Sequence, residues 1–274
     1  MSDHVSHFLE NGHIQTAYNE IGDNDTIPLV LIHGFTGSKL DFANQLNWFA
    51  QDRRVIALDQ RGHGESTNQG PYDFYGLVHD LFGFLDQMDI KQCHLLGHSM
   101  GGMVAMRALL AEPHRFASAI LMDTAAEPLT LFPDKIREQL NEIVIEKGCE
   151  ALLEGMRNQT QNEAVKRSMD YLGEAEHWRR IRVKLEQMDP QAFVELGACL
   201  GKAPPVLESL KTLSLPVTVV VGEEDTPFLK PSELMAAALP LGRLVTIPDA
   251  AHSPQYENPQ AWRAVIEAHL TQSP

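Results

Sequence analysis

Ser99 lies in Gly97-His98-Ser99-Met100-Gly101-Gly102, where it has the surroundings of a reactive serine. The apolar run His94-Leu95-Leu96 precedes the segment and a helical pattern from Met100 to Glu112 follows it, which puts the serine at a strand-to-helix turn. Glycines on both sides suit such a turn, because backbone and neighbouring elements approach closely there. A G-x-S-x-G pattern also arises by chance, but its place directly after a core strand favours Ser99 as a nucleophile.

A serine hydroxyl is a weak nucleophile until a base removes its proton, so a histidine is needed elsewhere in the chain. In α/β-hydrolases, whose nucleophile turn this segment resembles, the acid and then the histidine follow the serine. That order leaves four candidates: His114, His177, His252 and His269. His252 is favoured as the base because its loop, residues 248–254, follows a predicted strand from Arg243 to Ile247. The other three are expected at the surface.

The base needs an acid that holds the imidazole in one tautomer and stabilises its cation. Asp225 follows the predicted strand Val217 to Val221 and is therefore expected at its carboxyl end. In open α/β sheets, ligands bind at the carboxyl ends of the strands. We therefore predict Asp225 as the acid. Its neighbours Glu223 and Glu224 are rivals, and so is Asp123, which follows the preceding strand.

Acyl chemistry also needs two backbone N–H groups to hold a developing oxyanion. Met100, directly after Ser99, is the predicted first donor. Phe35, in the loop His33-Gly34-Phe35-Thr36-Gly37 after the first parallel strand, is the predicted second donor. His33 precedes Ser99 and is interpreted as a residue that hydrogen-bonds within this loop.

The elements that position these residues follow from the apolar pattern. Asn11-Gly12 favours a tight turn between two antiparallel strands within residues 8–21. Short apolar runs that suit parallel strands buried on both faces follow at 29–32, 55–58, 94–96, 119–122, 217–221 and 243–247. Helical patterns alternate with them at 40–51, 73–88, 100–112, 231–239 and 259–270. This alternation predicts an α/β fold, an open and mostly parallel sheet with helices on both faces.

The strand pattern is interrupted between residues 128 and 204, where helix-forming residues dominate. Helices are expected at 137–147, 149–158, 163–172 and 174–188. We therefore predict a core domain of residues 1–127 and 205–274, with 128–204 as a helical insertion. Several large apolar residues of the insertion are candidates for an acyl pocket, although such residues more often pack: Phe132, Met156, Met169, Trp178, Met188 and Phe193.

Composition limits the partners. The formal net charge of −15 disfavours nucleic acid and anionic membrane surfaces. Cys93, Cys149 and Cys199 are far apart and odd in number, which predicts neither a disulfide framework nor a metal site and fits a reducing cytoplasm. The first residues have no basic segment followed by an apolar run, and no later run is long enough to cross a membrane. A cytoplasmic chain without a membrane span is expected.

The chain as a whole resembles the α/β-hydrolase superfamily, through motifs that occur in order: His33-Gly34-Phe35, Asp59-Gln60-Arg61-Gly62-His63-Gly64-Glu65-Ser66, Gly97 to Gly102, Gly222 to Asp225, and His252. The resemblance implies a lid at the position of the insertion, and neither metal nor organic cofactor. It is strongest to small carboxylesterases, enol-lactonases and carbon-carbon bond hydrolases. Epoxide hydrolases and haloalkane dehalogenases use an aspartate nucleophile, so Ser99 argues against both.

Two departures narrow the resemblance further. The menaquinone-pathway synthase that eliminates pyruvate typically has an arginine after the double glycine, where this chain has Met103. Cofactor-free haloperoxidases usually have tryptophan where Phe35 stands. We therefore predict a carboxylic ester hydrolase acting on a small, mostly apolar substrate through an acyl-enzyme on Ser99. A lyase or carbon-carbon bond hydrolase using the same residues is the alternative, followed by a nearly inactive ligand-binding protein.

Overall fold

A single sheet organises the chain. The computed structural model describes residues 5–23, 25–130, 133–158 and 162–272. In this part of the chain the sheet has 8 strands in the order β1-β2-β4-β3-β5-β6-β7-β8. They are β1 (His7–Asn11), β2 (Ile14–Ile21), β3 (Leu29–Ile32), β4 (Val55–Leu58), β5 (Cys93–His98), β6 (Phe116–Met122), β7 (Val217–Gly222) and β8 (Gly242–Ile247).

The two ends of the sheet differ in strand direction. β1 and β2 form an antiparallel hairpin whose turn contains Gly12 at a φ of 64°, a conformation that glycine adopts without strain. β2 is also antiparallel to β4, and every pairing from β4 to β8 is parallel. The predicted α/β-hydrolase fold, with its mostly parallel sheet, is thereby confirmed.

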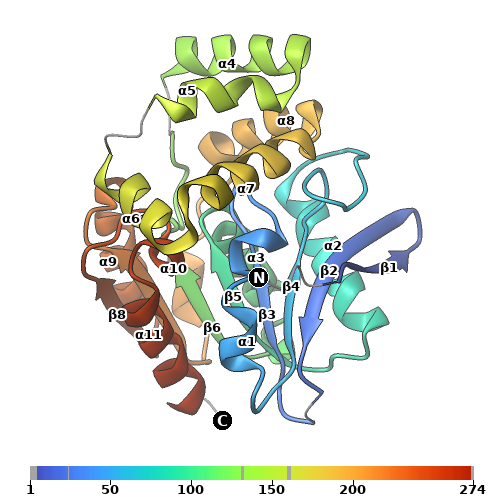
Figure 1. The fold of residues 1–274 in the computed structure, drawn as a ribbon. Coiled ribbons are helices and arrows are strands. Elements are labelled where there is room, and N and C mark those ends of the chain that lie inside the picture. The colour runs from blue at the N-terminus through green and yellow to red at the C-terminus, as the bar shows by residue number, and fades with distance from the viewer. Residues whose placement is uncertain (1–4, 24, 131–132, 159–161, 273–274) are drawn as a thin grey trace.

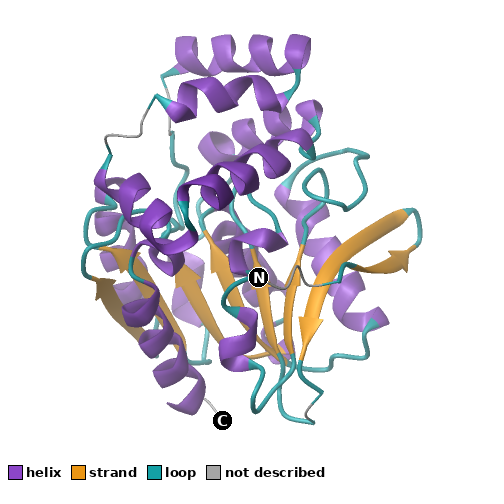
Figure 2. Ribbon diagram, viewed as in Figure 1, coloured by secondary structure: helices purple, strands orange, loops and turns teal. Residues whose placement is uncertain are grey.

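Alternate residues of the central strands point to opposite faces of the sheet. In β3, Val30 and Ile32 pack into a core with α2, α3 and α9, whereas Leu29 and Leu31 pack into a second core with α1 and α11. Both faces are therefore covered, which explains the nearly continuous apolar runs (Figure 2). These helices are α1 (Leu46–Phe49), α2 (Phe74–Gln87), α3 (Met100–Ala111), α9 (Thr226–Ala238) and α11 (Pro259–Gln272).

Two predicted helices have different bounds in the structure. Residues 40–51 form two short pieces rather than one helix, because Ser38 caps a separate 3-10 turn, η1 (Lys39–Phe42), before α1 begins. α9 begins at Thr226 instead of Pro231, and Pro231 lies inside it. Pro227 fits the first turn of α9, where a missing N–H costs nothing.

The chain between β6 and β7 contains helices and no strand in its described residues. The helices are α4 (Asp134–Lys147), α5 (Leu153–Arg157), α6 (Glu163–Leu172), α7 (Glu174–Glu186) and α8 (Pro190–Lys202), with a 3-10 turn, η3 (Cys149–Leu152), before α5. α8 was not predicted as a separate helix, although Asp189-Pro190 is a typical helix start that the structure uses. α4 and α5 lie farthest from the sheet, and α7 and α8 lie between them and the strands (Figure 1).

Candidate active site

Ser99 occupies the turn between β5 and α3 with a φ of 52° and a ψ of −117°. A positive φ is uncommon for a residue with a side chain and is typical of a strained, over-determined turn. Hydrogen bonds hold it there: the Ser99 N–H donates to the Met122 carbonyl at 2.8 Å, and the Thr124 hydroxyl donates to the Ser99 carbonyl at 2.7 Å. These two hydrogen bonds therefore fix the backbone of Ser99, and with it the position of the Ser99 Cβ.

The flanking glycines are needed for space. A Cβ on Gly97 would lie 2.5 Å from the Gly101 carbonyl oxygen, and a Cβ on Gly101 would lie 2.5 Å from the carbonyl oxygens of Ile32 and His33. These obstacles are backbone atoms, which cannot move aside as a flexible side chain could. The three glycines of the turn therefore let α3 start directly against β3 and β5.

Two hydrogen bonds connect Ser99, His252 and Asp225. His252 Nδ1 lies 2.7 Å from Asp225 Oδ2, and His252 Nε2 lies 3.0 Å from Ser99 Oγ. A carboxylate only accepts, so Nδ1–H is the donor to Asp225, and in the neutral ring Nε2 accepts the serine hydroxyl. The structure thus brings together the serine, histidine and aspartate named from the sequence, which follow β5, β8 and β7.

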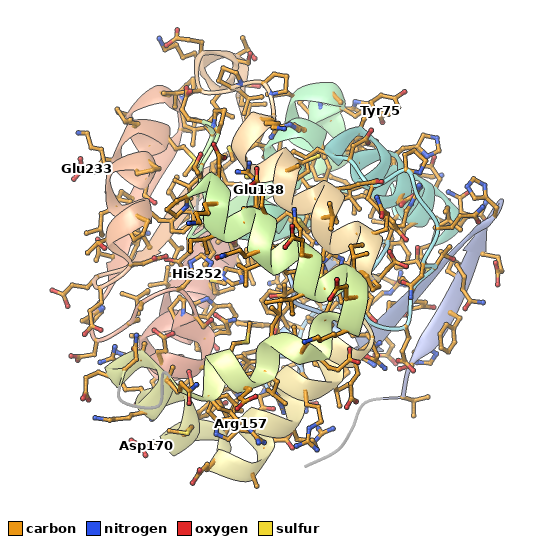
Figure 3. The ribbon with its side chains drawn as sticks, turned by 90° about the horizontal axis from the view of Figure 1, so that it is seen from above. Tyr75, Glu138, Arg157, Asp170, Glu233 and His252 are labelled. Atoms are coloured by element: carbon orange, nitrogen blue, oxygen red, sulfur yellow. The ribbon has the colours of Figure 1, made fainter. Side chains whose placement is uncertain are left out.

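The imidazole of His252 is packed from two sides. The Phe228 ring stacks on it at 4.8 Å between centroids, and the His98 ring lies 5.0 Å away. Burial and the nearby His252 lower the pKa of His98 to about 3, so His98 is neutral and its Nε2–H donates to the His252 carbonyl at 2.7 Å. The His252 side chain is still 42% exposed, which leaves room for a substrate. Viewed from above, His252 lies inside the outline of the molecule, whereas Tyr75 and Glu233 lie at its edge (Figure 3).

The rival acids lie elsewhere. Glu223 and Glu224 are exposed, and Glu224 forms an ion pair with Arg167 of α6 at 2.5 Å. Asp123 is completely buried behind Asp225, with its Oδ1 accepting the Gly222 N–H at 2.8 Å. Burial and the neighbouring Asp225 raise the pKa of Asp123 well above its usual range. In the described residues only Asp225 forms a hydrogen bond with His252 Nδ1.

The loop after β3 lies directly against Ser99. A Cβ on Gly34 would be 3.0 Å from the Ser99 Cβ, and Phe35 follows at once. Met100 is the first residue of α3, where N–H groups have no partner within the helix. His33 is buried and hydrogen-bonds inside the loop, since Nδ1–H donates to the Gly34 carbonyl at 2.8 Å. Its Nε2 also accepts the N–H of Gln60, which follows β4, at 3.0 Å. That interpretation of His33 is confirmed.

Comparison with known proteins assigns the chain to a family. Residues 29–265 match the model of the alpha/beta hydrolase family. The chain belongs to this family. It is 26% identical over 94% of its length to a protein of Bacillus subtilis that is provisionally named 2-succinyl-6-hydroxy-2,4-cyclohexadiene-1-carboxylate synthase, of which the match covers 95%.

Solved structures agree with the family over the whole chain. A thermophilic esterase from Thermogutta terrifontis is 26% identical, with a TM-score of 0.82 over 98% of this chain and 99% of that one. An enol-lactonase from Burkholderia xenovorans LB400 shares the fold, with a TM-score of 0.81 over 96% of this chain and 99% of that one at 20% identity. The chain is therefore an enzyme of the α/β-hydrolase superfamily.

The expected surface position of two histidines of this alpha/beta hydrolase is wrong. His269 is 3% exposed and His177 is 8% exposed, whereas His114 is exposed as predicted. His269 joins Thr218 and Ser118 in buried hydrogen bonds of 2.8 and 2.7 Å, so its polar atoms are paired under the sheet. A polar residue in an amphipathic helix is expected at the surface, but hydrogen-bonded partners allow His269 to be buried.

The apolar residues suggested for an acyl pocket have different environments in the structure. Met156, Met188 and Phe193 pack together in the core of the inserted helices. Phe193 also contacts the Phe35 ring at 5.1 Å between centroids and lines a narrow cavity of about 40 Å³ between α4 and α8. Trp178 is buried and Met169 is partly buried. Phe132 lies outside the described residues.

A larger groove lies away from the site. It has a volume of about 760 Å³ and runs between α2, α3 and the end of α8, and none of Ser99, Asp225 and His252 lines it. The reactive groups and the hydrogen bonds between them locate the candidate site better than the size of a hollow does. None of the helices in the described ranges combines the length and the apolar character that crossing a membrane requires.

Proposed function

We propose that this alpha/beta hydrolase cleaves an ester, or a related acyl bond, of a small and mostly apolar substrate through an acyl-enzyme on Ser99. The observation that carries the proposal is the chain of hydrogen bonds from Ser99 Oγ through His252 to Asp225, at 3.0 and 2.7 Å. A serine needs a base in contact, and the base needs a group that orients it. Both requirements are met by side chains that follow three parallel strands.

The steps follow from the donors and acceptors. Ser99 Oγ attacks the substrate carbonyl while His252 Nε2 takes the serine proton, and Asp225 stabilises the imidazolium. The N–H groups of Met100 and Phe35 hold the oxyanion of the tetrahedral intermediate. His252 then protonates the leaving alcohol, which departs, and next removes a proton from the water that hydrolyses the acyl-enzyme. No cofactor or metal is part of this scheme.

Residues 128–204 are proposed as a lid over a core of residues 1–127 and 205–274. The inserted helices support this role, because α6 contacts the Asp225 loop through the Arg167–Glu224 ion pair and α8 contacts the Phe35 loop through Phe193. The cavity beside Phe35 is lined mostly by apolar side chains, among them Leu129, Leu140 and Leu200. Phe35, one of the proposed oxyanion donors, is part of this lining, which supports the binding of a small apolar group beside it.

The named relatives support an ester or lactone substrate, since one solved structure is an esterase and another is an enol-lactonase. The full-length similarity to the Bacillus subtilis synthase favours a second candidate, a lyase reaction in which the same three residues abstract a proton. Met103 stands at the position where an arginine is expected in that synthase, and this weakens the second candidate.

Hydrolysis of p-nitrophenyl esters of increasing chain length, with lactones and a β-diketone alongside, tests the proposal. We expect Ser99→Ala to lower kcat on the order of 10⁶-fold, because a triad serine acts as one unit with its base. Ser209→Ala, at an exposed serine of the 3-10 turn Glu208–Thr212, is the matched control and should leave kcat unchanged. A Ser99→Ala protein that keeps more than about a thousandth of wild-type turnover would contradict the proposal.

Trapping of the intermediate distinguishes the two candidates. A rapidly quenched reaction with a slowly deacylating ester should add the acyl mass to the peptide that contains Ser99. A lyase forms no such adduct with its own substrate. Turnover of the synthase substrate at a higher kcat/KM than any ester, without an adduct on Ser99, would favour the lyase.

A further inference from the structure

One carboxylate holds the backbone on both sides of His252. Glu257, the last residue of α10 (Pro254–Glu257), accepts the Ala251 N–H through Oε2 and the Ser253 N–H through Oε1, the latter at 3.1 Å. The carbonyl of His252 itself accepts Nε2–H of His98 at 2.7 Å. The peptide groups before and after the imidazole-bearing residue are thus fixed by side chains, so the loop does not depend on strand pairing for its shape.

The charge of Glu257 is part of the site. Burial raises the pKa of Glu257, while the two N–H donors, Arg167 and His252 oppose that effect. Arg167 extends from α6 and forms an ion pair with Glu224, which precedes Asp225. The cation of Arg167 therefore lies near both the loop that carries the acid and the loop that carries the histidine. Asp249, at the start of the histidine loop, also favours the charged form of Arg167.

We propose that Glu257 is a positioning residue for His252: its carboxylate fixes the backbone that carries the imidazole, and its negative charge favours the imidazolium formed during the reaction. Arg167 acts in the opposite electrostatic sense and links the loop that carries Asp225 to α6 through Glu224. The inference rests on the proposed function, because it assigns Glu257 to the same site. Neither residue was singled out in the sequence, where Glu257 stands in a short segment between His252 and the last helix.

Geometry makes the effect large enough to measure. Displacement of a reacting group by about 1 Å can cost about 100-fold in rate. Glu257→Gln keeps the shape of the side chain, but its amide can accept only one of the two N–H groups and has no charge. We therefore expect kcat/KM for p-nitrophenyl acetate to fall by about 10- to 100-fold, mainly through kcat. Glu257→Asp keeps the charge and should recover part of the loss.

A pH profile separates positioning from a merely structural role. Loss of the negative charge in Glu257→Gln disfavours the imidazolium, so the acidic limb of the kcat/KM profile should move to lower pH. Arg167→Gln removes a positive charge from the same place, so the acidic limb should move to higher pH. A residue that only supported the fold would change the amplitude of the profile and leave its midpoint in place. Opposite shifts in the two variants are thus the specific signature.

The experiment measures full pH profiles of the wild-type chain, Glu257→Gln, Glu257→Asp and Arg167→Gln, together with the labelling rate of Ser99 by a fluorophosphonate. Glu267→Gln, in an exposed ion pair of α11, is the control and should match the wild type. An unlabelled wild-type Ser99 would refute the proposed function itself. A labelled wild type with unshifted midpoints in both charge variants would overturn the role of Glu257 while the function stands. If Glu257→Gln does not fold, Glu257→Asp decides: a lowered kcat with an unshifted midpoint supports the positioning role, and an unchanged kcat overturns it.

Discussion

Asp123 and Asp225 are two neighbouring buried carboxyl groups, and replacement of Asp123 by asparagine tests whether Asp123 is protonated. Asp123 is fully buried, and its Oδ1 accepts the Gly222 N–H at 2.8 Å. Burial and the neighbouring Asp225 raise its pKa well above the usual range. The raised pKa favours the protonated, uncharged form of Asp123, which an asparagine imitates while its amide oxygen still accepts the Gly222 N–H.

The magnitude follows from proton linkage. The folded-state pKa of Asp123 is raised, so above the unfolded-state value of about 3.9 the folded chain binds more protons than the unfolded chain. The free energy of unfolding then falls as the pH rises, by about 1.4 kcal/mol per pH unit, until the pH passes the folded-state pKa. Asp123→Asn has no such titration. Below that range the two proteins should differ by about 1 kcal/mol, the value of one altered hydrogen bond.

Urea unfolding from pH 5 to pH 9 measures this difference, because titrating groups that do not interact with Asp123 cancel between the two proteins. We expect Asp123→Asn to gain stability relative to the wild type as the pH rises, and the gain to level off. Asp170→Asn, at an exposed position of α6, should show a constant difference. A constant difference for Asp123→Asn would refute the reasoning about its protonation.

The same variant decides which aspartate is the acid. Asp225→Asn should lower kcat by about 10⁴-fold, as expected when the histidine is left in the wrong tautomer. Asp123→Asn should keep kcat within about 10-fold, since it changes one hydrogen bond behind the acid. The reverse order of the two effects would identify Asp123 as the acid instead.

Two further predictions concern stability. Gly97→Ala should destabilise the chain by about 1–3 kcal/mol and lower turnover, because the added Cβ would lie 2.5 Å from a backbone oxygen. Gly155→Ala in α5 should stabilise the chain by up to about 1 kcal/mol, because no atom lies within 4 Å of the added Cβ. Burial raises the pKa of Asp41, but the ion pair with Lys184 at 2.6 Å opposes burial, and the net effect is a lowered pKa. Lys184→Gln should therefore lower the free energy of unfolding by about 3 kcal/mol at neutral pH. Because a lowered carboxyl pKa stabilises above the unfolded-state value and that stabilisation is lost in acid, the Lys184→Gln cost should shrink below about pH 4 in urea unfolding, and a pH-independent cost would contradict it.

The fold was predictable where one physical signal dominated. Strands buried on both faces show as apolar runs, and the runs at 29–32, 55–58 and 217–221 coincide with or lie within β3, β4 and β7. The segment 40–51 was mispredicted as one helix, because its apolar spacing fits a helix while the cap at Ser38 makes a separate turn. Apolar spacing alone does not predict where α8 begins; its start depends on the cap Asp189 and on Pro190 in the first turn.

Within the candidate site, the residues found from sequence are those whose chemistry depends on their own side chain and their place after a strand. Ser99, Asp225 and His252 meet that description, and the structure brings both Ser99 and Asp225 within hydrogen-bond distance of His252. Glu257 was invisible because its role depends on backbone N–H groups, which every residue except proline has. A sequence pattern can mark a side chain that reacts, but a side chain that binds backbone leaves no residue pair to search for. Residues such as Glu257, which act on His252 through the backbone and through charge, are therefore found only from the three-dimensional structure. The opposite pH shifts expected for Glu257→Gln and Arg167→Gln measure their effect on the imidazolium.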